Sequence, residues 1–115
     1  MALEAGAFEA RVRFVSEMAK RLHQYGTSAP RLESAIDKVS VRLGLRCNSL
    51  STPTSIILSF GDAGDDPDAL PRFTQVLRVE PGEVNLRRLS ETDAIAERVY
   101  HGELDVAQGL KLLQA

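Results

Sequence analysis

The sequence predicts an α+β domain in the order ααβββαα: a two-helix hairpin, a three-stranded antiparallel sheet and two C-terminal helices. Two observations support this fold class. A turn at Thr52-Pro53-Thr54 leads directly into the most apolar β-type segment of the chain, and apolar residues recur at helical spacing before and after the strand region. At 115 residues the chain is expected to form a single two-layer domain over residues 1–115.

The central strand is predicted at residues 55–60. Ile56, Leu58 and Phe60 alternate on one face, which is strongly apolar, so we expect this face to point into a core covered by helices. Pro53 presets φ in a turn and lacks an N–H, so the preceding strand must end near it. The pattern predicts a hairpin.

Two helices are predicted before the sheet, at residues 8–25 and from Pro30 to Gly44. Gly26 can close the first helix, and Thr27 or Ser28 supplies an oxygen to cap the second. The short linker favours antiparallel packing of the pair.

The remaining elements are two outer strands and two helices. Strands are predicted at residues 46–51 and 73–79, and an acidic, exposed and mobile loop at residues 61–71. Asn85 is a good N-cap for a helix ending at Gly102, and Val84 is placed to pack back on its first turn. Asp105 and Gln108 then have the spacing of a capping box for a final helix. Phe8, Phe14, Phe60 and Phe73 are expected in the core.

Composition excludes several classes of function. Fourteen basic and sixteen acidic residues give a net charge of −2 without a basic stripe, which argues against a nucleic-acid partner. Neither a membrane-length apolar run nor a secretory signal pattern is present in the sequence, so a cytoplasmic location is expected. The single cysteine, Cys47, fits a reducing compartment.

No catalytic, cofactor or metal site is predicted. A cysteine nucleophile would need Cys47 beside His23 or His101, and both histidines are expected at helix ends, where the dipole favours a cation. The aspartates of the acidic loop lack the order of a calcium-binding loop and its final glutamate. Motifs of serine hydrolases, nucleotide-binding loops and zinc proteases are absent from the sequence.

Two polar clusters are candidate ligand or partner sites, although each also suits a helix cap or a turn. The candidate residues are Tyr25, Gly26, Thr27, Thr52, Pro53 and Thr54.

Nearly the whole chain, from about residue 11 to 113, resembles the N-terminal cytoplasmic domain of the threonine/serine exporter family. The residues that carry this resemblance are Arg21-Leu22, Tyr25-Gly26-Thr27, Glu33, Ile36, Leu43-Gly44-Leu45, Thr52 to Ser59, Val79, Asn85-Leu86, Leu89 and Val99 to Ala107. One departure is Ser55, where the family usually has glycine, so a different turn type is expected.

The resemblance implies an accessory domain that gates, assembles or senses on the cytoplasmic side of a membrane transporter. Its expected partner is a transmembrane transporter domain, in its own or a separate chain, and a small amino-acid-like ligand and a homo-oligomer are further expectations. The natural gene is then expected to continue past Ala115 into an apolar run of about 20 residues. Two alternatives stay open: a hydrolase-like domain for small substrates, and an interaction module that uses the uncovered face of the sheet.

Overall fold

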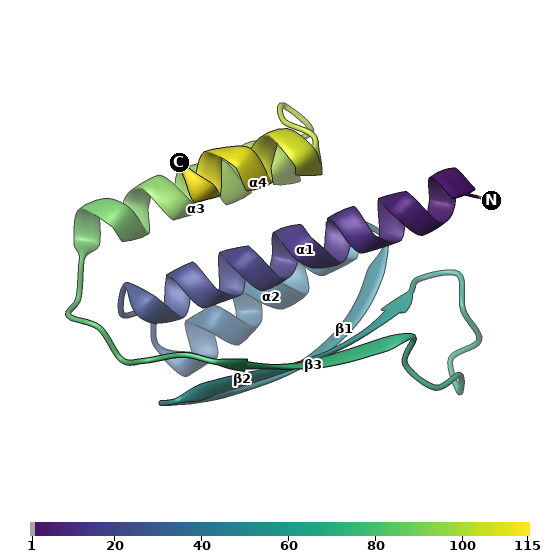
Figure 1. The fold of residues 1–115 in the computed structure, drawn as a ribbon, viewed down its shortest axis with the longest axis horizontal. Helices are drawn as coiled ribbons and strands as arrows, with labels where there is room; N and C mark the ends of the chain where they lie inside the picture. The colour runs from purple at the N-terminus through teal and green to yellow at the C-terminus, as the bar shows by residue number, and fades with distance from the viewer. Residues whose placement is uncertain (1) are drawn as a thin grey trace.

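The computed structural model describes residues 2–115, with side chains from residue 7 onward, and confirms the predicted fold class and element order (Figure 1). The described elements are α1 (Ala2–Gln24), α2 (Ala29–Arg42), β1 (Leu45–Thr52), β2 (Ser55–Asp62), β3 (Phe73–Arg78), α3 (Leu86–Tyr100) and α4 (Val106–Gln114). The first helix begins earlier than the predicted residue 8, and β1 and β2 form a longer hairpin than predicted.

The sheet is an antiparallel meander in the order β1-β2-β3. Leu58, at the centre of β2, lies opposite Ser49 on β1 and Gln75 on β3. Ile56, Leu58 and Phe60 are completely buried, which confirms that this face of β2 points into the core. The core exists because these side chains alternate with Ile57 and Ser59, whose positions put them on the uncovered face.

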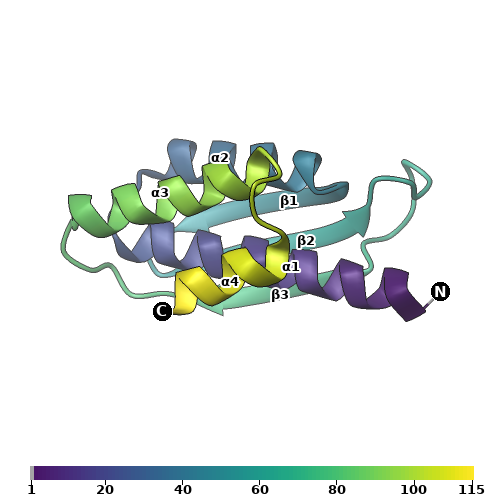
Figure 2. The same cartoon turned by 90° about the horizontal axis from the view of Figure 1, so that it is seen from above.

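The helices occupy two tiers above one face of the sheet, whereas a single helical layer was expected. α2 packs along β1 and α1 lies over β2, while α3 and α4 pack mainly against α1 and each other (Figures 1 and 2). The apolar periodicity of α3 and α4 shows that each helix buries one face, but it does not show whether that face packs on the sheet or on another helix. Gly109 decides the contact of α4, because a Cβ there would lie 2.7 Å from Cε1 of Phe14 on α1.

Four of the predicted helix-end devices are present. Gly26 and Gly102 have φ of 100° and 78°, the left-handed conformation that follows α1 and α3. The Asn85 side chain accepts a hydrogen bond from the Arg88 N–H at 3.0 Å. Asp105 and Gln108 form the reciprocal capping box.

The predicted cap of α2 is not formed by a side chain. Ser28 occupies the N-cap position without a side-chain hydrogen bond, and the hydroxyl oxygen of Thr27 is buried without a partner in the described part of the chain. Pro30 in the first turn removes one of the N–H groups that a cap would satisfy.

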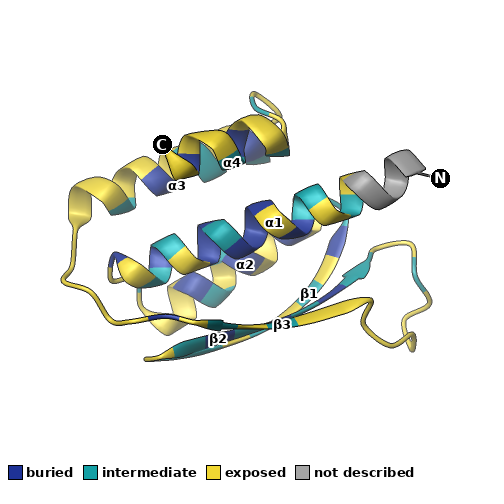
Figure 3. Ribbon diagram, viewed as in Figure 1, coloured by how far each residue is buried: buried dark blue, intermediate teal, exposed yellow. Residues whose placement is uncertain are grey.

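Two apolar positions differ from the sequence prediction. Phe73, expected in the core, is 45% exposed, and Val84, expected to pack on α3, is 66% exposed. Burial is concentrated in the first two helices and the hairpin, while β3 and the loop before it are largely exposed (Figure 3). Phe73 begins the edge strand β3, and Val84 lies in the segment between β3 and α3. Periodicity does not show how far the helices cover such positions.

Candidate functional site

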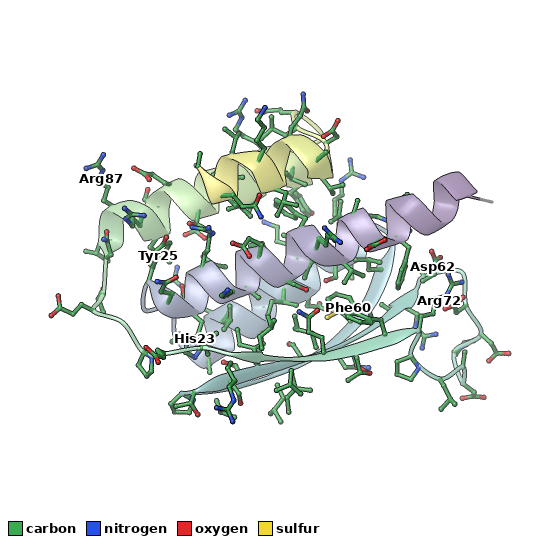
Figure 4. All side chains as sticks on the ribbon, in the orientation of Figure 1. His23, Tyr25, Phe60, Asp62, Arg72 and Arg87 are labelled. Atoms are coloured by element: carbon green, nitrogen blue, oxygen red, sulfur yellow. The ribbon has the colours of Figure 1, made fainter. Side chains whose placement is uncertain are left out.

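The two predicted polar clusters lie at the same end of the molecule. Nε2 of His23, near the end of α1, is 2.8 Å from the carbonyl oxygen of Thr52 in the hairpin turn. The N–H of Asn85 donates to the carbonyl of Tyr25 at 3.2 Å, which brings the start of α3 to the same place (Figure 4). The sequence predicts for His23 only a position at a helix end, where the dipole favours a cation. It does not predict that this residue links the two clusters.

Thr52 organises the hairpin turn. Its hydroxyl oxygen accepts hydrogen bonds from the N–H groups of Ser55 at 3.0 Å and Thr54 at 3.3 Å, and it lies 2.8 Å from Oγ of Ser55. No non-glycine residue among those described has positive φ, so Ser55 fits where the family usually has glycine. The hydroxyl of Thr52 is thus engaged inside the turn, as a structural role requires.

Tyr25 has a different environment, because two arginines converge on it. Its hydroxyl is 3.5 Å from Nη1 of Arg21, and the Arg88 guanidinium lies 6.0 Å from the centre of its ring. Hydrogen bonding by Arg88, helped by Arg21, lowers the pKa of the Tyr25 hydroxyl below its ordinary value despite the opposing effect of burial. A cavity of about 40 Å³ beside these residues has room for a water molecule or one small polar group.

Two buried polar atoms near the clusters lack partners in the described part of the chain: Nδ1 of His23 and Oγ1 of Thr27. Because a carbonyl oxygen only accepts, Nε2 of His23 must carry the proton in its bond to Thr52, which leaves Nδ1 as an acceptor in the neutral ring. Unsatisfied polar atoms of this kind are rare in native proteins and are often bound to ordered water.

A large cavity lies away from both clusters. It is an open groove of about 710 Å³ between α1, β3 and the end of α4, and it takes no residue from Tyr25–Thr27 or Thr52–Thr54. Phe8 and Val12 of α1, Phe73 and Leu77 of β3 and Leu110 of α4 supply its apolar lining. Sequence reasoning missed it, because the groove results from β3 lying beside α1 without a helix of its own.

The acidic loop is held by arginines rather than being free. Arg72 donates two hydrogen bonds to the Asp65 carboxylate, and Arg11 on α1 contacts Asp62 at 3.4 Å (Figure 4). Arg46 donates to the carbonyls of Asp66 and Pro67 at 2.8 and 2.9 Å. The loop is exposed as predicted, and it contacts Arg46 of β1, Arg11 of α1 and Arg72 just before β3.

Cys47 is placed unfavourably for nucleophilic chemistry. Burial raises the pKa of its thiol to about 11, so the reactive thiolate is scarce at neutral pH. The hydrogen bonds of the two histidines lead elsewhere: His23 to Thr52, and His101 to Glu97 at 3.1 Å.

The described residues contain no group of three or more histidine, cysteine, aspartate or glutamate side chains placed to hold a metal ion. Within the same residues, no helix combines the length and apolar character needed to cross a membrane.

Comparison with known proteins gives one family. A sequence profile of the family described as "Putative threonine/serine exporter" matches residues 13–115. Pheromone-regulated membrane protein 10 of Saccharomyces cerevisiae (strain YJM789) is 33% identical over 103 residues, which are 90% of this chain and 13% of that protein. The proteins of the same name from Yarrowia lipolytica and Pichia sorbitophila are 33% and 31% identical, over 85% and 90% of this chain and 8% and 10% of theirs.

The chain therefore spans only about a tenth of the length of these curated relatives, which are membrane proteins by name. No solved structure matches it with significance. The profile match begins within α1 and includes every later helix and strand, so it extends over both polar clusters and the acidic loop. Phe8, Glu9 and Val12 of the groove, and Arg11, precede it. On this evidence, the chain belongs to the threonine/serine exporter family.

Proposed function

We propose that this chain is an accessory domain of an exporter of small amino acids such as threonine and serine. It acts on the cytoplasmic side, on membrane-spanning helices of its own or a separate chain, and it gates or assembles them. The observation that carries the proposal is the family match over residues 13–115, which includes the whole of the sheet and three complete helices.

The internal ties of the domain support a mechanical role. At one end, His23 joins the end of α1 to the hairpin turn. At the other, Arg11 donates to the carbonyl of Leu43 at 2.7 Å and contacts Asp62, so α1 is joined to the end of α2 and to β2. A helix tied to the sheet near its middle and near its C-terminal end moves with it, and such a rigid unit can transmit a displacement to a membrane partner.

The environment of Cys47 supports a role without chemistry of its own. A hydrolase that used this thiol would need a neighbour that ionises it. Burial instead raises the pKa of Cys47, the Asp37 carboxylate raises it further, and hydrogen bonding by Ser40 does not offset this. A small amino-acid-like ligand is a secondary proposal. Its carboxylate would bind beside Tyr25, where Arg21 and Arg88 converge and where arginine suits carboxylate recognition.

The test is amino-acid efflux from cells. The natural gene, with the membrane protein encoded alongside it if that is separate, is expressed in cells that lack threonine export and are preloaded with labelled threonine. We expect efflux well above the vector control, and a several-fold loss when residues 13–115 are deleted. His23→Ala should give an intermediate loss, while His101→Ala serves as the matched control.

Membrane levels of each variant are measured in parallel, so that a loss of efflux is not confused with a loss of protein. Efflux of neither threonine nor serine above the vector control would contradict the proposal. Unchanged efflux after the deletion, at equal membrane level, would contradict the accessory role.

A further inference from the structure

The two edges of the sheet are protected differently. On β1, the N–H of Ser51 donates to the carboxylate of Glu33 on α2 at 3.0 Å, so a helix side chain occupies that edge. Just after β3, the N–H of Val79 donates to the carbonyl oxygen of Thr54 in the turn before β2, and by alternation the N–H groups of Thr74 and Val76 point away from the sheet. Among the described residues, none donates to or accepts from those outward groups.

The side chains along β3 are also incompletely covered. Phe73 is 45% exposed on the helix side of the strand, and Val76 is 64% exposed on the other side. The groove beside α1 lies over this strand, with Phe73, Gln75 and Leu77 lining it. A free edge combined with half-exposed apolar residues is a template for pairing with another strand.

The charges on the groove side of α1 point to a second copy as the partner. Glu9, Arg13, Glu17 and Lys20 line the groove in that order, so the signs along the helix read minus, plus, minus, plus. Reversed, the same series reads plus, minus, plus, minus. An antiparallel copy of α1 therefore faces each charge with its opposite, and the centre of the series lies close to residue 15.

The strand and the helix share this centre. Oγ of Ser16 donates to Oε1 of Gln75 at 3.2 Å, so the middle of the charge series lies above the middle of β3. A two-fold axis perpendicular to the sheet, passing beside Gln75 between the two β3 strands, relates both the strands and the α1 helices of the two copies in antiparallel order. It pairs β3 with its copy and sets the two α1 helices about three strand spacings, roughly 14 Å, apart, within reach of opposing long side chains.

We propose that the chain forms a symmetric homodimer by antiparallel pairing of its two β3 strands around Gln75. The backbone groups of Thr74 pair with those of Val76 of the second copy, and Phe73 packs beside Leu77 of the second copy in the joined grooves. The result is a continuous six-stranded sheet, flanked by Glu9 to Lys20 and Arg13 to Glu17 ion pairs between copies. This proposal does not depend on the transport role.

Two ion pairs within α1 involve charges of this series. Glu17 contacts Arg21 at 2.9 Å with both side chains less than a quarter exposed, so Arg13 of the second copy would share a carboxylate that already has a partner. Arg13 contacts Glu9 at 3.0 Å with both side chains about two-thirds exposed, a kind of pair that contributes little and exchanges easily. Lys20 has no ion-pair partner within the described residues. Both ends of the charge series are thus available to a second copy.

Sedimentation equilibrium over a concentration series tests the strand pairing. We expect a reversible dimer and, because short interfaces bind weakly, the series should extend to about 500 μM. Val76→Pro removes an outward N–H on an edge strand, where proline is tolerated, and should raise the dimer Kd at least about tenfold. Val76→Thr keeps the N–H and is the matched control, expected to dimerise normally.

A charge exchange tests the helix register. Lys20→Glu places two carboxylates opposite each other and should weaken the dimer several-fold, as should Glu9→Lys. The double variant, Glu9→Lys with Lys20→Glu, restores opposite signs across the axis and should recover most of the wild-type affinity. Melting curves of each variant show whether the fold is intact.

The outcomes separate cleanly. The proposal is supported if Val76→Pro weakens the dimer, each single charge variant weakens it, and the double charge variant recovers the affinity that the single charge variants lose. A wild-type chain that stays monomeric through the whole series overturns it. A dimer of unchanged affinity in folded Val76→Pro overturns it too, because the interface then lies elsewhere.

Discussion

Arg72 and Asp65 form a two-pronged ion pair across the base of the acidic loop. Nε and Nη2 of Arg72 donate to the two carboxylate oxygens of Asp65 at 2.9 and 2.6 Å. The Arg72 guanidinium also lies 5.5 Å from the centre of the Phe8 ring on α1. The loop is thereby held to the start of β3 and to the first helix, although its composition is that of a mobile segment.

The Asp65 carboxylate should titrate at unusually low pH because of this pair. Hydrogen bonding from Arg72 lowers the pKa of Asp65 below the ordinary aspartate value of 3.8, and Arg72→Gln should return it toward that value. A depressed carboxyl pKa stabilises the fold above the unfolded-state pKa and is lost as pH falls through the folded-state pKa, so the effect is confined to pH below about 4. Carbon-detected NMR titration measures it.

Arg87→Gln is the control for this titration, because Arg87 pairs with Glu91 on an exposed turn of α3 (Figure 4). It should leave the Asp65 titration unchanged. An Asp65 midpoint that is the same in wild type and Arg72→Gln would show that the pair is not populated in solution.

Cys47 should react slowly with thiol reagents in the folded protein. Its pKa of about 11, against an ordinary cysteine value of 9.0, makes the thiolate fraction at pH 8 about a hundredfold smaller than in the unfolded chain. Stability should fall as pH rises between about 9 and 11, because there the unfolded chain loses a proton that the folded one keeps. Reaction with a chromogenic disulfide, with and without urea, measures the first effect.

A surface thiol provides the comparison for Cys47. Ala69→Cys in a Cys47→Ser background places the thiol on the exposed loop and should react at similar rates in both conditions. Fast labelling of native Cys47 at pH 8 would show that the strand opens or that the thiol is ionised.

Gly109→Ala should destabilise the protein, against the usual trend. Alanine in place of glycine within a helix ordinarily adds about 1 kcal/mol of stability. Here the new Cβ would lie 2.6 Å from Cγ2 of Val99 and 2.7 Å from Cε1 of Phe14, so α4 must shift away from its neighbours. We expect a net loss of about 1–3 kcal/mol in urea unfolding.

Lys111→Ala, on the exposed side of α4, is the control and should change stability by less than about 0.5 kcal/mol. Combining Gly109→Ala with Phe14→Leu should cost less than the sum of the two single changes, because the smaller side chain leaves room for the Cβ. A stabilising Gly109→Ala would mean that α4 is not packed on α1.

Leu58→Ala should cost about 2–5 kcal/mol of unfolding free energy, because it leaves a cavity in the centre of the core. Leu58 is completely buried in β2, whereas Leu50, on the opposite face of the hairpin, is 56% exposed. Leu50→Ala should therefore cost much less in the same denaturant melts. Equal costs for the two variants would refute the register of the sheet.

Local patterns in the sequence determined the elements and the inner face of the sheet. Alternation of Ile56, Leu58 and Phe60 fixes which side of β2 is buried, because successive side chains of a strand point to opposite faces. The capping box at Asp105 and the glycine at residue 102 act within a few residues of their positions, so they are legible without tertiary structure. The motif around Thr52 likewise carried the family resemblance that the profile match confirms.

The tertiary structure alone decided how these elements meet. The link from His23 to Thr52 joins residues 29 positions apart, and the contact from Arg11 to Asp62 joins residues 51 apart. Local spacing says nothing about such pairs, since they depend on how the helices stack on the sheet. For the same reason the exposure of Phe73 and the groove beside it were unforeseen: they arise because α1 packs mainly over β2 and covers the edge strand β3 only in part.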